Sequence, residues 1–318
     1  MSLEVEQKDL AARWMAAARA GDFAAAWRIS DRALAVRVGT TCWHLPRHEQ
    51  WVWDGRPLQD RRVLVRCYHG LGDTIQFARF LPALGGVARE VVVWAQPQLL
   101  PLLRTLPGRR ELLPLHDGSP DTDYEVDLEI MELPHALRTT LDSLPAQVPY
   151  FRVPPAPRLA HELSIGLVAR AGDFNAWRSA PAELLVWVAQ DLPVARFGLQ
   201  LGGLPGTIDI SSTDVLTVAA RVQALDLVIT VDTMMAHLAG ALGVRTWTLL
   251  AEPADWRWMD ERTDSPWYPC MRLFRQPSPR DWAAVIGAVR EALRREVEGS
   301  RGEGRGQLVS PGRERSEP

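Results

Sequence analysis

The apolar residues of the chain follow a helical pattern near its N-terminus. Over residues 8–36 they recur three and four positions apart, and Gly21-Asp22 interrupts the pattern in the middle. This spacing predicts a helical hairpin, that is, two helices joined by a tight turn. Because one such pair cannot bury its apolar face alone, we expect the hairpin to pack against the rest of the protein.

From Arg62 onward the pattern changes to apolar runs separated by helical stripes. VLVRC (63–67) and VVVW (91–94) are rich in valine, as expected for strands that are covered on both faces. Helical spacing runs over residues 75–81 between them, and ELLPL (111–115) and YEVDLEI (124–130) are predicted to be further strands. This alternation predicts a parallel sheet with right-handed crossovers.

A second series of this kind follows a proline-rich stretch. VPYFRVPPAPR (148–158) has the composition of a linker between domains. Beyond it we predict four more strands and a final helix, at residues 164–169, 196–201, 225–231, 246–250 and 281–296.

The expected fold is therefore α/β, with two Rossmann-like domains that face each other across a cleft and a short N-terminal helical hairpin. After Val297 the chain is rich in charge, glycine and proline and poor in apolar residues, which predicts a disordered tail. The expected boundaries are 1–40 for the hairpin, 41–150 for the first domain, 151–297 for the second and 298–318 for the tail.

Composition and charge exclude several classes of protein. Hydrophobic residues make up 47% of the chain and the net charge is −3, so no basic field points to nucleic acid. MSLEVEQKDL has no apolar signal core and no apolar run reaches the ~20 residues of a membrane helix, so we expect a cytoplasmic protein without stable membrane insertion. Cys42, Cys67 and Cys270 are odd in number and far apart, which argues against a disulfide framework.

The first candidate site is YHGLGDTIQFARF (68–80), directly after the first predicted strand. Gly70 and Gly72 allow a sharp turn and a close approach of a ligand to the backbone. Asp73 then lies at the carboxyl end of the sheet, where ligands bind in α/β folds, and can take a proton from an acceptor hydroxyl. The alternative is that Asp73 caps the following helix.

The second candidate site is LDLVITVDTMMAHLAGALG (225–243), in which a buried strand ends at Asp232 and Thr233 opens a helix. The first amides of that helix, at Thr233, Met234 and Met235, are suited to a diphosphate. His237 lies one turn further on and can donate a hydrogen bond to a phosphate or sugar oxygen; the alternative is a structural histidine.

Two further groups of residues complete the predicted site. The loop at 254–276 is crowded with aromatic residues, and Trp256 can either stack on a base or sugar ring or fill a small core between the domains. Arg170 and Arg178 follow the first strand of the second domain, where an arginine can neutralise donor phosphates or form a surface ion pair.

Four segments together resemble the glycosyltransferase family 9-like domain of bacterial tetratricopeptide-repeat glycosyltransferases, and the match runs from about residue 40 to 295. That group is similar to the ADP-heptose:lipopolysaccharide heptosyltransferases and, more distantly, to the O-GlcNAc transferases. The hairpin resembles a single tetratricopeptide unit. The four segments are HLPRHEQWVWDGRPL (44–58), GLGDTIQFARFLP (70–82), LDLVITVDTMMAHLAGALG (225–243) and DWRWMDERTDSPWYPCMRLFRQ (255–276).

The resemblance implies a GT-B fold, a donor diphosphate bound by the second domain, and Asp73 as the candidate base. It also implies that Asp232, Thr233 and His237 fall in the donor site. The chain departs from the family in two places near the cleft. Tyr68 and His69 stand where the family usually has Glu-Gln, and Ala169–Gly172 reads Ala-Arg-Ala-Gly where it usually has Trp-Ala-Gly-Asn.

The expected function is inverting transfer of a sugar from a nucleotide-diphosphate donor to a glycan, lipopolysaccharide or protein acceptor. We expect no cofactor and no metal, and we interpret Asp121-Thr-Asp123 as a solvated turn despite its Asp-x-Asp spacing. The alternatives are a non-catalytic sugar-nucleotide-binding or partner protein and a sugar-nucleotide epimerase.

Overall fold

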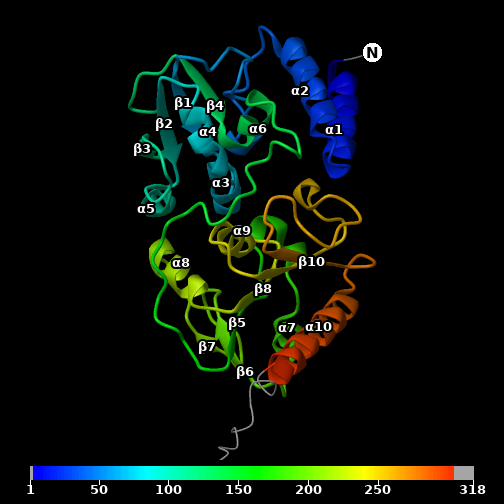
Figure 1. Cartoon of the computed structure of the whole chain (residues 1–318). Coiled ribbons are helices and arrows are strands. Elements are labelled where there is room, and N and C mark those ends of the chain that lie inside the picture. The colour runs from blue at the N-terminus through cyan, green and yellow to red at the C-terminus, as the bar shows by residue number, and fades with distance from the viewer. Residues whose placement is uncertain (1–2, 304–318) are drawn as a thin grey trace, which may run out of the picture.

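The computed structural model describes residues 3–303, with side chains described for residues 8–172 and 175–299. The predicted helical hairpin is formed by α1 (Leu3–Arg19) and α2 (Phe23–Arg37), which lie side by side at the top of Figure 1. Gly21 supplies the positive φ of +76° that the tight turn needs, and Asp22 caps α2 by accepting from the Ala25 amide at 2.9 Å. The likeness of the hairpin to a tetratricopeptide unit stays a prediction.

The first domain contains the predicted parallel sheet, in the order β3-β2-β1-β4. Its core strands are nearly all buried, as the valine-rich runs predicted. The elements are β1 (Arg62–Arg66), α3 (Leu71–Phe77), α4 (Leu81–Gly85), β2 (Glu90–Ala95), α5 (Leu100–Leu103), β3 (Glu111–Pro114), β4 (Val126–Glu129) and α6 (Leu133–Ala136).

The second domain has a six-stranded parallel sheet in the order β7-β6-β5-β8-β9-β10. Chain order reverses between β5 and β8, as it does between β1 and β4 in the first domain, and ligands of open α/β sheets bind at such switch points. The elements are β5 (Leu163–Val168), α7 (Ala182–Trp187), β6 (Val194–Gly198), β7 (Ile208–Asp209), α8 (Val215–Gln223), β8 (Leu227–Val231), α9 (Met234–Ala241), β9 (Thr246–Leu250), β10 (Met271–Arg275) and α10 (Trp282–Glu303).

The structure corrects the sequence prediction at several elements. The segment 254–276 was expected to be a loop, but it ends in β10, which pairs in parallel with β9. MRLFR (271–275) has a short alternation of apolar and charged residues, which was not recognised as a strand because aromatic residues crowd the same segment. The helical stripe at 75–81 is not one helix, because a 3₁₀ turn over Ala78–Phe80 separates α3 from α4. Neither the short edge strand β7 nor the start of β6 at Val194 was predicted.

The proline-rich segment between the domains is packed against both of them. The Tyr150 hydroxyl donates to the Ile75 carbonyl of α3 at 2.9 Å, while the Tyr150 amide donates to the Ala241 carbonyl of α9 at 3.1 Å. The linker therefore holds α3 and α9 together, and these two helices form the main contact between the domains. The expected domain boundaries at residues 40 and 150 stay predictions.

The helical hairpin packs on both domains. Trp27 donates through its indole N–H to the Thr139 carbonyl of the first domain, and Arg19 forms an ion pair with Asp260 of the second at 2.8 Å. The edge of the Trp14 ring meets Trp256 of the second domain with ring centroids 5.2 Å apart. The expectation that the hairpin packs on the body is confirmed.

The C-terminal helix α10 continues past the expected start of the tail. Residues 298–303 belong to the helix, and the rest of the predicted disordered tail, residues 304–318, lies outside the described residues. The three cysteines are free, as expected. Within residues 3–303, no helix combines the length and apolar character that a membrane span requires.

Candidate functional site

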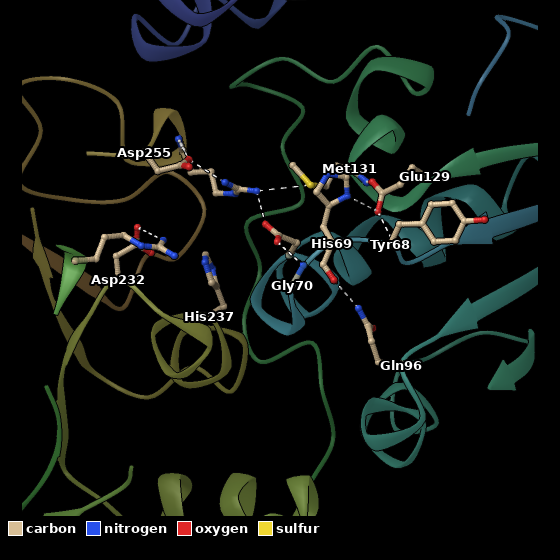
Figure 2. Close-up of polar contacts among 12 residues, drawn as sticks. Tyr68, His69, Gly70, Gln96, Glu129, Met131, Asp232, His237 and Asp255 are labelled. Atoms are coloured by element: carbon tan, nitrogen blue, oxygen red, sulfur yellow. Dashed lines mark hydrogen bonds and ion pairs between the residues drawn. The ribbon is translucent and has the colours of Figure 1, made fainter. Parts of the chain in front are cut away.

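The candidate site lies where the carboxyl ends of β1, β4 and β8 meet the boundary between the domains. Figure 2 shows the polar groups that gather there, from the loop after β1 on one side to the loop after β8 on the other. Both switch points of the sheets face this boundary, so the fold itself assembles residues from distant parts of the chain.

Asp73 is the third residue of α3 and has a partner for each carboxylate oxygen. Oδ2 accepts from the Gly70 amide at 2.9 Å, which is half of a capping box, and Oδ1 forms an ion pair with Arg257 of the second domain. The side chain keeps 24% of its surface exposed. Asp73 therefore caps its helix, as the alternative interpretation expected, and also faces the interdomain site.

Arg257 links the two domains and was missed by the sequence analysis. It is buried, and it pairs with Asp255 at 2.8 Å as well as with Asp73. Burial acts to lower the pKa of Arg257, but Asp255 and Asp73 outweigh it and raise the pKa above its ordinary value. Nη2 also lies 3.8 Å from the Met131 sulfur, and Nε has no hydrogen-bond partner. The only signal for Arg257 in the sequence was its place among the tryptophans of the 254–276 segment.

Asp232 and Arg178 form a second ion pair at the end of β8. Arg178 Nη1 donates to Asp232 Oδ2 at 3.0 Å, so the structure brings these two predicted site residues together. Burial raises the pKa of Asp232, and the Arg178 charge opposes that shift. Arg178 follows β5, and β5 is adjacent to β8 in the sheet, which explains the meeting of residues 54 positions apart in the chain.

The start of α9 lies at the boundary between the domains, next to Gly72 of α3. Thr233 occupies the N-cap position in an extended conformation, and its side chain makes no capping hydrogen bond. The amides at Met234 and Met235 begin the helix, where backbone N–H groups have no partner within the helix. Such a terminus attracts anions, as the sequence analysis expected for the donor diphosphate.

His237 is buried in the interface between the domains. Its Nδ1 lies 3.1 Å from the Tyr268 hydroxyl, and its ring stacks on Trp258 with centroids 5.5 Å apart. Burial lowers the pKa of His237 well below its ordinary value, with help from the charges of Arg257, Arg79 and Arg178, so the ring is neutral. These contacts are those of a structural histidine, the second interpretation of His237. The neutral ring still carries one N–H and can donate a hydrogen bond.

Gly70 and Gly72 were expected to allow a sharp turn and a close approach of a ligand, but the structure gives them other roles. Neither has a positive φ, so their backbone conformations are open to any residue. A Cβ on Gly72 would come within 2.9 Å of the His237 ring and 3.3 Å of the Met234 Cα. Gly72 therefore permits close packing of α3 on α9, and a Cβ on Gly70 would crowd the Asp73 carboxylate at 3.1 Å.

His69 lies beside this contact on the first domain. Its Nδ1 is 3.0 Å from Oε1 of the buried Glu129, and its carbonyl accepts from Gln96 at 2.8 Å. Burial acts to lower the pKa of His69, but the neighbouring Glu129 carboxylate raises it overall. Glu129 also receives the Tyr68 amide at 3.2 Å, so it orders both residues at which the chain departs from the family pattern. Glu129 was not singled out from the sequence, in which its one signal is a place near the end of a predicted strand.

Of the two remaining candidates, Trp256 lies against the Arg257 guanidinium, 5.2 Å from the ring centroid, and Arg170 lies at the surface. Trp256 is buried among Trp14, Phe23, Phe77 and Trp267, so it fills a core between the domains and the hairpin, the second of its two interpretations. Arg170 is exposed, and only its amide has a described partner.

Sequence comparison identifies a curated relative of the chain. No protein-family model matches the chain. The protein FlbA of Caulobacter vibrioides is 27% identical over 291 residues, covering 76% of this chain and 48% of its own length, so the chain spans about half of that relative.

Solved structures of the glycosyltransferase TibC from enterotoxigenic Escherichia coli H10407 share the fold. The iron-containing dodecameric enzyme is 13% identical with a TM-score of 0.50, covering 80% of this chain and 78% of its own. Its complex with ADP-D-beta-D-heptose is 12% identical with a TM-score of 0.51, covering 80% and 81%. The expected fold, two Rossmann-like domains of GT-B type, is confirmed, and the resemblance to family 9-like heptosyltransferases holds at the level of that fold.

Proposed function

We propose that the chain is a glycosyltransferase that moves a sugar from a nucleotide-diphosphate donor to an acceptor hydroxyl, with inversion and without a metal. One observation carries the proposal. Asp73 of the first domain pairs with Arg257 of the second, and the neighbouring Gly72 packs on the start of α9, which follows the Arg178–Asp232 pair at the end of β8. The TibC structure with a nucleotide-diphosphate sugar on the same fold supports a donor of this class.

In this proposal the second domain binds the leaving group. The amides of Met234 and Met235 and the guanidinium of Arg178 face the negative charge of the diphosphate. Their charges are fixed before the reaction, so they stabilise the departing diphosphate without a reorganisation cost. Helix amides and arginine together replace the charge that a metal would supply.

The first domain activates the acceptor. The acceptor oxygen attacks the anomeric carbon, its proton passes to the Asp73 carboxylate, and the bond between the anomeric carbon and the diphosphate oxygen breaks with its electron pair on the diphosphate. Arg257 holds Asp73 from the side of the second domain, so the position of the base depends on how the domains meet. Attack on the face opposite to the leaving group gives inversion.

One observation favours a second candidate function, a non-catalytic sugar-nucleotide binder. Both oxygens of Asp73 are already engaged, one by the Gly70 amide and one by Arg257. These two contacts fix the carboxylate in place without requiring any chemistry from it. In a pure binder the Asp73–Arg257 pair would serve only to hold the domains together.

Release of free nucleotide diphosphate separates the two functions. A transferase releases it from a nucleotide-sugar donor only when an acceptor is present, and a binder releases none. The screen begins with thermal shifts against a panel of nucleotide diphosphates and their sugars, because saturating ligand raises stability by RT ln(1 + [L]/Kd). Release is then measured with each stabilising donor against glycan, lipopolysaccharide and protein acceptors, and acceptor-independent release would instead favour an epimerase that hydrolyses its substrate.

A further inference from the structure

A cavity lies between the helical hairpin and the first domain. It measures about 350 Å³, and its wall is mainly apolar. α1 and α2 form one side, and Trp53, Met131, Glu132 and His135 of the first domain form the other. The residues that give it its character are Trp14, Trp27, Leu34, Arg37, Trp53 and Glu132.

Almost every polar group in this wall already has a partner. The Trp14 indole N–H donates to Ser30 Oγ at 3.1 Å, the Trp27 indole to a backbone carbonyl, and the Trp53 indole to another at 3.0 Å. The His135 ring lies 2.8 Å from the Asp31 carboxylate. These groups therefore present only their apolar surfaces to the cavity.

Glu132 is likewise satisfied by the backbone. Its Oε2 accepts from the amides of Trp53 at 2.9 Å and Glu129 at 2.8 Å. Burial raises the pKa of Glu132 to about 7, against the lowering effect of these amides.

Arg37 is the exception. Its guanidinium lies 4.6 Å from the centre of the Trp51 ring, and it makes no hydrogen bond or ion pair with any side chain or carbonyl that the structure describes. Burial lowers its pKa while the Glu132 charge opposes that shift, and an arginine in such a setting remains protonated. The cavity thus combines an apolar wall with one unpaired cation whose five N–H donors are available.

This cavity leads toward the candidate active site. A neighbouring cavity of about 280 Å³ shares Trp14, Trp27, Arg37, Met131 and Glu132 with it and continues to His69 and Glu129. Met131 touches Arg257, which pairs with Asp73. Arg37 lines both cavities, so a ligand bound to it reaches from the hairpin toward the candidate base.

We infer that the hairpin cavity binds a ligand that has an apolar body and one anionic group, a carboxylate or a phosphate, with the anion on Arg37 and the body against Trp14, Trp27 and Leu34. The apolar wall stabilises the body through burial, and the guanidinium supplies a charge-assisted bond. Because the hairpin cavity continues to the first-domain side of the candidate site, we assign this ligand to the acceptor. This assignment rests on the proposed function. The hairpin, remote from the donor-binding elements, is then part of acceptor recognition.

The test uses three probes with the same alkyl chain, octanoate, octyl phosphate and octanol, each titrated into the full chain below its micelle concentration. Binding is followed by calorimetry and by tryptophan fluorescence. The inference predicts that one or both anions bind at least tenfold more tightly than octanol, and the comparison of octanoate with octyl phosphate identifies the preferred anion.

Two variants locate the site. Arg37→Gln should remove the preference for the anions and weaken their binding at least tenfold. Arg28 is an exposed arginine on the same helix, and Arg28→Gln should leave anion binding unchanged. Ala33→Phe should fill the cavity and weaken all three probes, with the exposed Ala35→Phe as its control. Ala33→Phe tests the cavity even if Arg37→Gln does not fold.

Equal binding of octanol and the anions, equal effects of Arg37→Gln and Arg28→Gln, or no binding of any probe would each overturn the inference. Nucleotide diphosphates are titrated into the same preparations. Loss of probe binding with intact nucleotide binding contradicts the hairpin site alone, while absence of nucleotide binding contradicts the proposed function.

Discussion

At the scale of single residues, the boundary between the domains depends on a few buried charged groups. Arg257 is surrounded by carboxylates from both domains, and His237 is kept neutral by burial and by arginines. Each group is tolerated there because a specific partner offsets its desolvation. Substitutions at these positions therefore affect stability and function together, and matched controls are needed to separate them.

The first residue-scale prediction concerns Arg257. Arg257→Gln leaves the Asp73 and Asp255 carboxylates without their cation and should lower the free energy of unfolding by roughly 3 kcal/mol or more. Arg262→Gln breaks the more exposed pair with Asp264 in the same segment and should cost less than about 1 kcal/mol. Denaturant unfolding of both variants measures the difference, and equal losses would contradict a special role for Arg257.

The second residue-scale prediction concerns pH. The folded-state pKa of His237 lies well below its unfolded value of 6.5, so the unfolded chain takes up the proton first as the pH falls. The contribution of His237 to stability is therefore fully present above pH 6.5 and is lost below it, by at most about 1.4 kcal/mol per pH unit. His237→Gln should remove this part of the pH dependence.

Unfolding free energies between pH 5 and pH 8 test this, with the exposed His161→Gln as control. We expect a shallower loss of stability on acidification in His237→Gln than in either the parent or His161→Gln. Identical slopes in all three proteins would show that the His237 ring is not protected from protonation.

At the scale of elements, α3 and α9 decide how the two domains meet. Gly72 of α3 lies against His237 and the start of α9 at a distance that leaves no room for a Cβ. The Tyr150 side chain bonds to α3 while its backbone bonds to α9, which fixes the same pair from the linker. The candidate base and the start of α9 are therefore positioned by one helix–helix contact.

Gly72→Ala should accordingly force α3 and α9 apart. We expect a loss of about 1–3 kcal/mol in unfolding free energy, because the new methyl group overpacks a buried contact. Gly85→Ala, in α4 and with nothing within 4 Å of its added Cβ, should be neutral or slightly stabilising. Urea unfolding of the two variants measures the difference. A free energy of unfolding of Gly72→Ala equal to that of the wild type would mean that α3 and α9 can move apart without cost.

At the scale of the whole molecule, periodicity predicted the parallel sheets, and the glycosyltransferase-type fold was expected from the motifs. The pairing of Arg178 with Asp232 follows from strands whose neighbours are set by the sheet order, which the chain order does not reveal. Arg257 and Glu129 were missed because their roles depend on contacts between domains and between strands. Neither contact leaves a periodic pattern in the sequence.

The central claim is tested most directly by release of nucleotide diphosphate from a donor sugar in the wild type and in Asp73→Asn, with and without acceptor. The asparagine can still accept from the Gly70 amide, so the helix cap and donor binding should remain. We predict acceptor-dependent release by the wild type and about a 100-fold or greater loss of turnover in the variant, the usual scale for a general base. Turnover in Asp73→Asn close to that of the wild type would contradict it.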